Sequence, residues 1–160
     1  MGFVIAVLLT LAMAGSVLWV MPSAREKALS EMRQKALQNG VRVRLLDEKT
    51  AAKLYPWLED HRGLVNYELP LPAGRVWKFG KPYALSVNQE KLHELDRDTG
   101  LWPLVQAQLD IDDLPDSTEA LTFYSHAMAI LWREKEGVEA VELVCKKLKA
   151  GVALDLDRCI

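Results

Sequence analysis

Three histidines are among the residues whose types could support catalysis or metal binding in this sequence. His61, His93 and His126 lie far apart along the chain, and none belongs to a metal-ligand spacing. The dipeptide His93-Glu94 lacks the second histidine of a zinc-protease motif. The histidines therefore predict no metal site.

Two acidic runs resemble parts of cation sites. The run Asp96-Arg-Asp98-Thr-Gly100 begins like a calcium loop, but it lacks an acid or amide at the fifth position and a glutamate at the twelfth. The run Asp110-Ile-Asp112-Asp113 brings carboxylates together, yet LDIDDLPDS has the composition of an exposed linker. We expect an acid-rich turn and a linker, with no metal and no other cofactor.

Ser125 and His126 combine a nucleophile type with a base type. Adjacent residues on a strand point to opposite faces, so we expect no catalytic pair here. The sequence also lacks a GxSxG motif and a glycine-rich phosphate loop. An enzyme is therefore the less favoured interpretation, and the tryptophans and tyrosines are expected to belong to the core first.

The net charge and its distribution along the chain indicate which partners are possible. The chain of 160 residues has a formal net charge of −2, which does not favour nucleic acid. Cations interleaved with aromatic residues occur only around Trp77 and Phe79, too few for a nucleic-acid platform. The charge is uneven, with +4 over residues 24–46 and −7 over residues 88–120. Either the basic part faces anionic lipid headgroups, or these are two unrelated solvated faces.

Residues 1–22 predict a transmembrane anchor. They include GFVIAVLLTLAMAGSVLWVM, which carries no charge. About 20 helical residues at about 1.5 Å each cross the roughly 30 Å hydrocarbon core. A cleaved signal peptide is the alternative, but it would need a basic segment before the apolar one. We therefore expect an uncleaved, single-pass anchor in contact with the lipid bilayer.

Basic residues follow the predicted anchor and none precedes it. Such residues remain in the cytoplasm, so we expect an outer N-terminus and a cytoplasmic domain, in a bacterial inner membrane. The predicted membrane-interface residues are Trp19, Arg25, Lys27, Arg33 and Lys35. Ala6, Thr10 and Ala14 form a small-residue face through which a homo-oligomer could pack. The alternative is a domain on the outer side with Cys145 and Cys159 bridged.

The segment after the anchor predicts a basic amphipathic helix over residues 23–40. Ser23 and Glu26 have the spacing of a capping box, and Asn39-Gly40 is a typical helix end. This layout resembles the small accessory subunit of the bacterial preprotein translocase over about the first 45 residues. The glycine-rich strand-turn of that family is replaced by RVRLLDEKT, so we do not assign the chain to it.

Residues 41–152 predict an α+β domain with a mostly antiparallel sheet flanked by helices. Strands are expected at 41–45, 64–69, 75–79 and 83–87, the second and third paired through PLPAG. Helices are expected at 88–100, 102–109 and 138–149, the last ended by Gly151. Residues 120–132 predict a hairpin at Ser125-His126, with one buried helix as the alternative. Residues 153–160 predict a flexible tail.

These patterns together predict a non-enzymatic interaction or accessory module for a membrane complex, with a membrane protein as partner. The alternatives are a membrane-anchored enzyme, or a small-ligand-binding domain with an aromatic-lined pocket. The sequence names no substrate and no pathway.

Overall fold

The structure is a computed structural model that describes residues 2–5, 7, 10, 23–78, 81–87, 101–154 and 156. Its strands are β1 (Arg42–Leu45), β2 (Val65–Pro70), β3 (Tyr83–Ser86), β4 (Thr118–Tyr124) and β5 (Ala127–Trp132). Its helices are α2 (Ala24–Gln38), α3 (Glu48–Leu54), α5 (Leu101–Leu109), the 3₁₀ helix η2 (Ile111–Asp113) and α6 (Val138–Val152). The predicted α+β class is confirmed.

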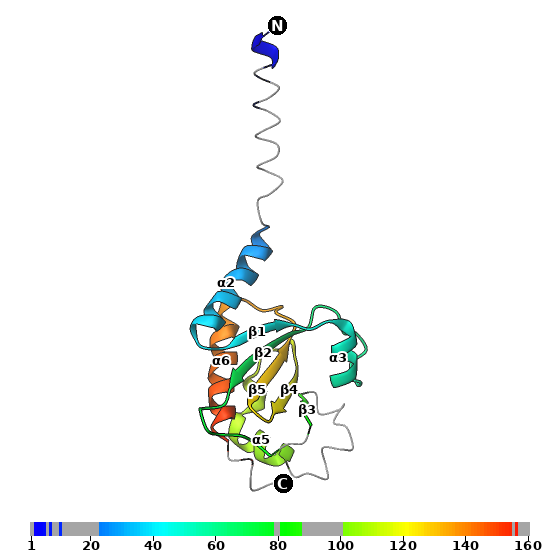
Figure 1. Cartoon of the computed structure of the whole chain (residues 1–160), viewed down its shortest axis with the longest axis vertical. Coiled ribbons are helices and arrows are strands. Elements are labelled where there is room, and N and C mark those ends of the chain that lie inside the picture. Colours follow the sequence, from blue (N-terminus) through cyan, green and yellow to red (C-terminus); the bar gives the residue numbers. More distant parts are fainter. Residues whose placement is uncertain are drawn as a thin grey trace.

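The strands form one antiparallel sheet in the order β1-β2-β5-β4-β3 (Figure 1). The register pairs Tyr67 of β2 with Ile130 of β5, and Phe123 of β4 with Met128 of β5. The predicted hairpin is confirmed, because β4 and β5 are joined by Ser125 and His126 alone. Strand β5, whose six residues are all buried, lies in the middle of the sheet.

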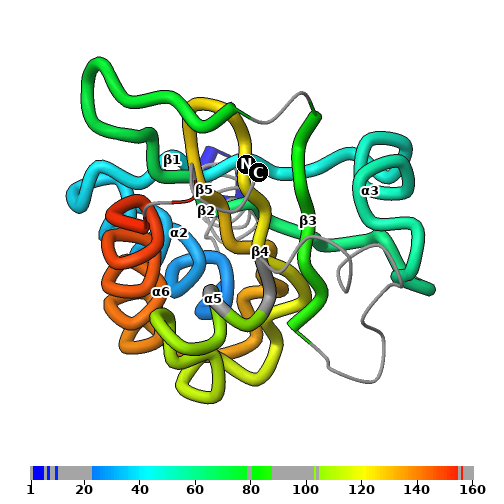
Figure 2. The backbone as a smooth tube through the Cα atoms, turned by 90° about the horizontal axis from the view of Figure 1, so that it is seen from below, coloured from blue at the N-terminus to red at the C-terminus, as the bar shows by residue number. Residues whose placement is uncertain are grey.

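One face of the sheet is covered by α2, α5 and α6 (Figure 2). Alternate strand residues point to this face, as the period of two requires. They include Tyr67, Phe123, Ile130 and Trp132, all fully buried. This face holds the main apolar core.

Helix α3 covers part of the opposite face, on the other side of the sheet from α6 (Figure 2). A smaller apolar cluster includes Ala51, Tyr55, Leu64 and Leu131. The sequence predicts a loop or short helix holding Tyr55, Pro56 and Trp57, and the structure places the helix just before these residues, with Tyr55 as its C-cap. Its signal is Asp47, which caps the helix by accepting the backbone N–H of Thr50 at 3.0 Å and its hydroxyl at 2.7 Å.

The capping box predicted at the start of α2 is confirmed. Ser23 accepts the Glu26 N–H at 3.2 Å, and its own N–H donates to the Glu26 carboxylate at 2.6 Å. The hydrogen bond that the Ser23 N–H donates to the Glu26 carboxylate lowers the pKa of Glu26. The helix ends at Gln38 with Asn39 as its C-cap, and Gly40 adopts φ +79°, which glycine tolerates without strain.

Helix α6 was predicted to end before Gly151 but continues to Val152. The glycine serves a close approach of α6 to β5. A Cβ atom on Gly151 would lie 1.9 Å from Sδ of Met128, inside any allowed contact. The residue therefore marks a packing site within the helix rather than its end.

The strand predicted over residues 75–79 is wrong, as is its pairing with β2. Residues 75–78 have no strand structure, and β2 pairs with β1 and β5. The backbone N–H of Trp77 donates instead to the Ser125 carbonyl at 2.8 Å. Arg75 donates to the carbonyls of Val152 at 3.0 Å and Leu154 at 2.6 Å, and so satisfies the end of α6.

The prediction of a single-pass membrane protein is also corrected. Within the part of the chain that the structure describes, no helix combines the length and the apolar content needed to cross a bilayer. Of the predicted span, residues 2–5, 7 and 10 are described and helical, and Trp19 lies outside the described residues. The described residues therefore give no support to the predicted single-pass span on which the membrane localisation was based.

Two other predictions concern the later part of the chain. The helix predicted over residues 88–100 lies outside the described residues. The helix predicted over residues 102–109 is confirmed as α5. Leu154 and Leu156, within the predicted tail, are both buried in the main core.

Candidate functional site

Among the described strands, β1 forms one edge of the sheet and pairs with β2 alone (Figure 1). The Leu46 N–H donates to the Leu64 carbonyl at 3.1 Å. Hydrogen-bonded pairs alternate along an antiparallel ladder, so Arg44 and Arg42 also bond to β2. The N–H and C=O groups of Val43 and Leu45 must then point away from the sheet.

The outer side of β1 is open at its C-terminal end. Within the described ranges, neither Val43 nor Leu45 has a backbone bond to another element on this side. Leu45 is 67 % exposed, the largest exposure of a large hydrophobic residue among those described from residue 23 onward. The edge therefore presents an unused row of backbone groups beside an apolar side chain.

Two arginines flank this edge on the other face of β1. Arg42 and Arg44 are both exposed. Arg44 lies 3.9 Å from the buried Glu68 carboxylate, a long ion pair, and Arg42 has no ion-pair partner among the described residues. The edge is consequently basic.

The opposite edge of the sheet, strand β3, is closed by comparison. The Val87 N–H donates to Glu119, so the same alternation turns Ala84 and Ser86 outward. Ser86 is only 3 % exposed. Among the described residues, an incoming strand would meet covered backbone at Ser86 of β3 and open backbone at Val43 and Leu45 of β1.

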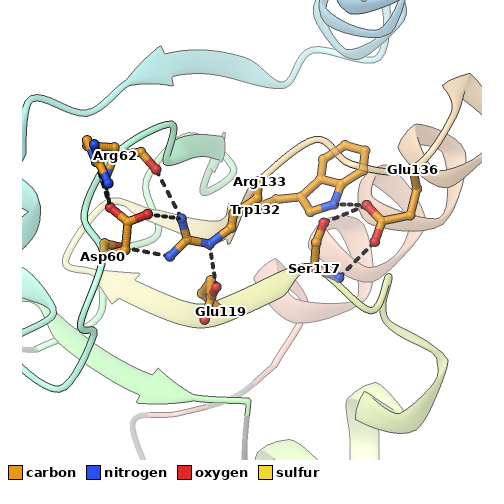
Figure 3. Close-up of polar contacts among 7 residues, drawn as sticks. All are labelled: Asp60, Arg62, Ser117, Glu119, Trp132, Arg133 and Glu136. Carbon is orange, nitrogen blue, oxygen red and sulfur yellow. Dashed lines mark hydrogen bonds and ion pairs between the residues drawn. The ribbon is translucent and has the colours of Figure 1, made fainter.

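Arg133, directly after β5, holds the loop before β2 against β4 (Figure 3). Its guanidinium donates to Glu119 at 2.5 Å and to the carbonyls of Asp60 at 2.6 Å and Arg62 at 3.0 Å. The Asp60 carboxylate lies 3.8 Å away, and its pKa is lowered, chiefly by hydrogen bonds from Arg62. The Arg133 guanidinium therefore holds two backbone carbonyls of the loop and one carboxylate of β4.

Glu136 lies in the segment between β5 and α6 and binds Ser117 and Trp132 (Figure 3). Its carboxylate accepts the Ser117 N–H at 2.8 Å, the Ser117 hydroxyl at 2.6 Å and the Trp132 indole N–H at 2.6 Å. Burial alone would raise the pKa of Glu136, but the hydrogen bonds outweigh it and lower the pKa.

Glu134 is buried and adopts φ +51°. Its carboxylate accepts two hydrogen bonds from Arg33 of α2, at 3.0 and 2.5 Å, and one from the Tyr67 hydroxyl at 2.7 Å. The bond to Glu134 raises the pKa of Arg33, and burial raises that of Tyr67. This partly buried pair joins α2 to the segment after β5 and, through Tyr67, to β2 as a specific geometric restraint.

The predicted membrane-interface residues have different roles in the structure: some form ion pairs within the domain and others are exposed. Arg33 binds Glu134, and Lys35 forms an ion pair with Glu142 of α6 at 2.6 Å. Arg25 and Lys27 are exposed on α2. The predicted small-residue face includes Thr10, which donates to the Val7 carbonyl, whereas Ala6 and Ala14 lie outside the described residues.

Several polar side chains lie together on the α3 side of the sheet. The Tyr55 and Thr122 hydroxyls are 2.8 Å apart and buried. Asn66 donates to the Tyr124 hydroxyl at 3.3 Å, and burial raises the pKa of both tyrosines. The Oδ1 atom of Asn66 has no hydrogen-bond partner among the described residues.

The residues first considered for chemistry do not assemble into a site in the described structure. Ser125 and His126 lie in the turn rather than on a strand, and Oγ and Nδ1 are 3.3 Å apart, so the two side chains are not forced to opposite faces. His61 contacts the Tyr55 carbonyl, and His93 lies outside the described residues. Among the described residues no three His, Cys, Asp or Glu side chains could hold one metal ion.

The acidic run at residues 110–113 has a structural role. The predicted linker includes η2, in which Ile111 is buried. Lys147 of α6 donates to the carbonyls of Leu109 at 2.8 Å and Asp110 at 2.5 Å. The Asp96 run lies outside the described residues. Cys145 is buried and free, and burial raises its pKa.

Four pockets on the described surface have volumes of about 390 to 820 Å³. Tryptophan and tyrosine line none of these four. The largest lies between α3 and the start of β3 and is lined by Lys49, Thr50, Lys53, Leu54, Lys81 and Pro82. This group could not be found from the sequence, because its members come from two segments that only the fold brings together.

Comparisons with models of protein families, with curated proteins and with solved structures found no match for this chain. Its function must therefore be inferred from the geometry of the domain itself.

Proposed function

We propose that this protein is a non-enzymatic interaction module that binds an extended, acidic segment of a partner protein along strand β1. The observation that carries the proposal is the open edge of β1, where the backbone groups of Val43 and Leu45 point outward. A partner segment would add to the sheet there as a further strand.

The side chains around the edge favour one kind of segment. Successive residues of an added strand alternate between the two faces of the sheet. On one face the partner would contact the exposed Leu45, and on the other it would contact Arg42 and Arg44. An alternation of apolar and acidic residues matches both contacts.

The charged networks inside the domain agree with a binding role. Arg133, Glu134 and Glu136 are each held by several hydrogen bonds that join loops or helices to the sheet. These bonds fix loops and helices to the sheet, and an edge on a preorganised sheet binds an added strand at a lower entropic cost.

The test is a proline substitution on the open edge. In Leu45→Pro the lost N–H points outward, so the ladder to β2 is retained while one bond to an added strand is removed. Ten-residue peptides displayed on phage are selected on the full chain. The proposal predicts enriched peptides that alternate apolar and acidic residues and bind Leu45→Pro at least about ten-fold more weakly.

Two variants separate backbone from side-chain effects. Leu45→Thr keeps the N–H and should retain most of the peptide affinity. Arg44→Pro removes an N–H that bonds to Asn66, so this variant should be destabilised whether or not a partner binds. Failure to enrich any peptide, or equal affinity of Leu45→Pro and wild type for the selected peptides, would refute the proposal.

A further inference from the structure

We infer that the pocket between α3 and the start of β3 binds a small organic phosphate through Lys49, Lys53 and Lys81. This site shares no residue with the β1 edge, so the inference is independent of the function proposed above. The three lysines concentrate positive charge at this pocket, on a chain whose formal net charge is −2.

The local structure brings the three lysines together. Lys49 and Lys53 are four residues apart on α3, which places them on the same side of the helix one turn apart. Lys81 comes from the segment just before β3, which borders the same pocket. All three side chains are exposed.

None of the three lysines has an acidic partner among the described residues, in contrast to lysines elsewhere. Lys35 pairs with Glu142 at 2.6 Å, and Lys147 lies 3.5 Å from Asp113. Like charges one helical turn apart repel each other, so the pocket holds positive charge that is not neutralised within the described structure. A bound anion would remove that repulsion.

The shape of the pocket indicates more than a bare anion. Its volume of about 820 Å³ is within the range usual for small-molecule sites. Leu54 and Pro82 contribute apolar surface, and the lysine stems add to it. The Thr50 hydroxyl is already bonded to Asp47, which leaves the ammonium groups as the main donors.

Phosphate fits these donors better than a carboxylate does. A carboxylate is best held by the fork of an arginine, and among the described residues no arginine lines this pocket. A phosphate monoester carries a charge close to −2 and three acceptor oxygens, which suit several ammonium donors. The ligand class is therefore a phosphate monoester whose organic part contacts Leu54 and Pro82.

The experiment uses phenyl phosphate as the probe and follows amide resonances of the ¹⁵N-labelled full chain. Phenyl phosphate should shift resonances of residues 49–54 and 81–82, and inorganic phosphate should bind at least about ten-fold more weakly, because it lacks the apolar part. Lys53→Gln should weaken binding of phenyl phosphate about ten-fold. The triple variant Lys49→Gln/Lys53→Gln/Lys81→Gln should show no shifts at the pocket.

Lys27→Gln and Lys146→Gln serve as matched controls, because both lysines are exposed and neither lines the pocket. They should bind phenyl phosphate as the wild type does. Equal losses in the controls would mean general attraction to positive charge and would overturn the inference. Shifts spread over the domain, or equal binding of inorganic phosphate, would overturn it too.

Discussion

The two faces of the sheet are built on different principles. The face under α2, α5 and α6 is closed by large apolar side chains such as Trp77, Phe123 and Trp132. The face under α3 combines a small apolar cluster with the buried hydroxyls of Tyr55 and Thr122. Apolar burial is non-directional, whereas hydrogen bonds fix geometry. We conclude that the first face supplies most of the stability and the second fixes where α3 and its lysines lie.

Neighbouring residues of β4 allow a direct test, and the larger effect belongs to the helix-covered face. Phe123 is fully buried, with its ring centroid 5.6 Å from that of Trp77. Phe123→Ala should lower the free energy of unfolding by about 3–5 kcal/mol, through lost burial and a cavity. Urea unfolding measures it. Val76→Ala, at a 60 % exposed position, should change it by less than about 0.5 kcal/mol. A loss below about 1 kcal/mol for Phe123→Ala would contradict the comparison.

Thr122 points to the opposite face and tests the polar contribution. Thr122→Val keeps the shape of the side chain but leaves the Tyr55 hydroxyl buried without this partner. We expect a loss of about 1–2 kcal/mol in the free energy of unfolding. The double variant Thr122→Val/Tyr55→Phe removes both hydroxyls and should recover most of the loss. If it were as unstable as the single variant, the hydrogen bond would not be the cause.

The smallest expected effect is a pH dependence at Glu136. Its pKa in the folded protein is lowered, so its stabilising contribution is complete above the ordinary value of 4.5 and is lost as the pH falls through the folded value. Glu136→Gln lacks this titration. Between pH 6 and pH 3 the wild type should lose more stability than the variant, by less than about 1 kcal/mol because the site is partly exposed. Parallel pH profiles in urea unfolding would contradict this assignment.

Local signals in the sequence predicted much of the fold. The capping box at Ser23 and Glu26, the alternation after Gly40 and the apolar stripe of α6 each depend on neighbours a few residues away. These elements lie close to where they were predicted. Strand order and register between distant segments have no such signal.

The failures share a physical cause. Residues 75–78 alternate as a strand does, but Arg75 binds carbonyls at the end of α6, 77 and 79 residues away. The open edge at β1 depends on which strand has no second neighbour, and the lysine pocket depends on α3 and Lys81 meeting. The predicted membrane span was based on the length of an uncharged apolar run and its flanking residues, and no helix in the described ranges meets the requirement.

The position of β5 in the sheet has a consequence for synthesis on the ribosome. Its neighbour β2 ends at residue 70, but β5 itself begins only at residue 127. During translation one side of β2 therefore stays unpaired until over fifty further residues have been synthesised. In that time β2 can pair wrongly with other chains. The last strand to leave the ribosome completes the centre of the sheet. A stalled or truncated chain would thus lack the middle of the domain rather than its margin.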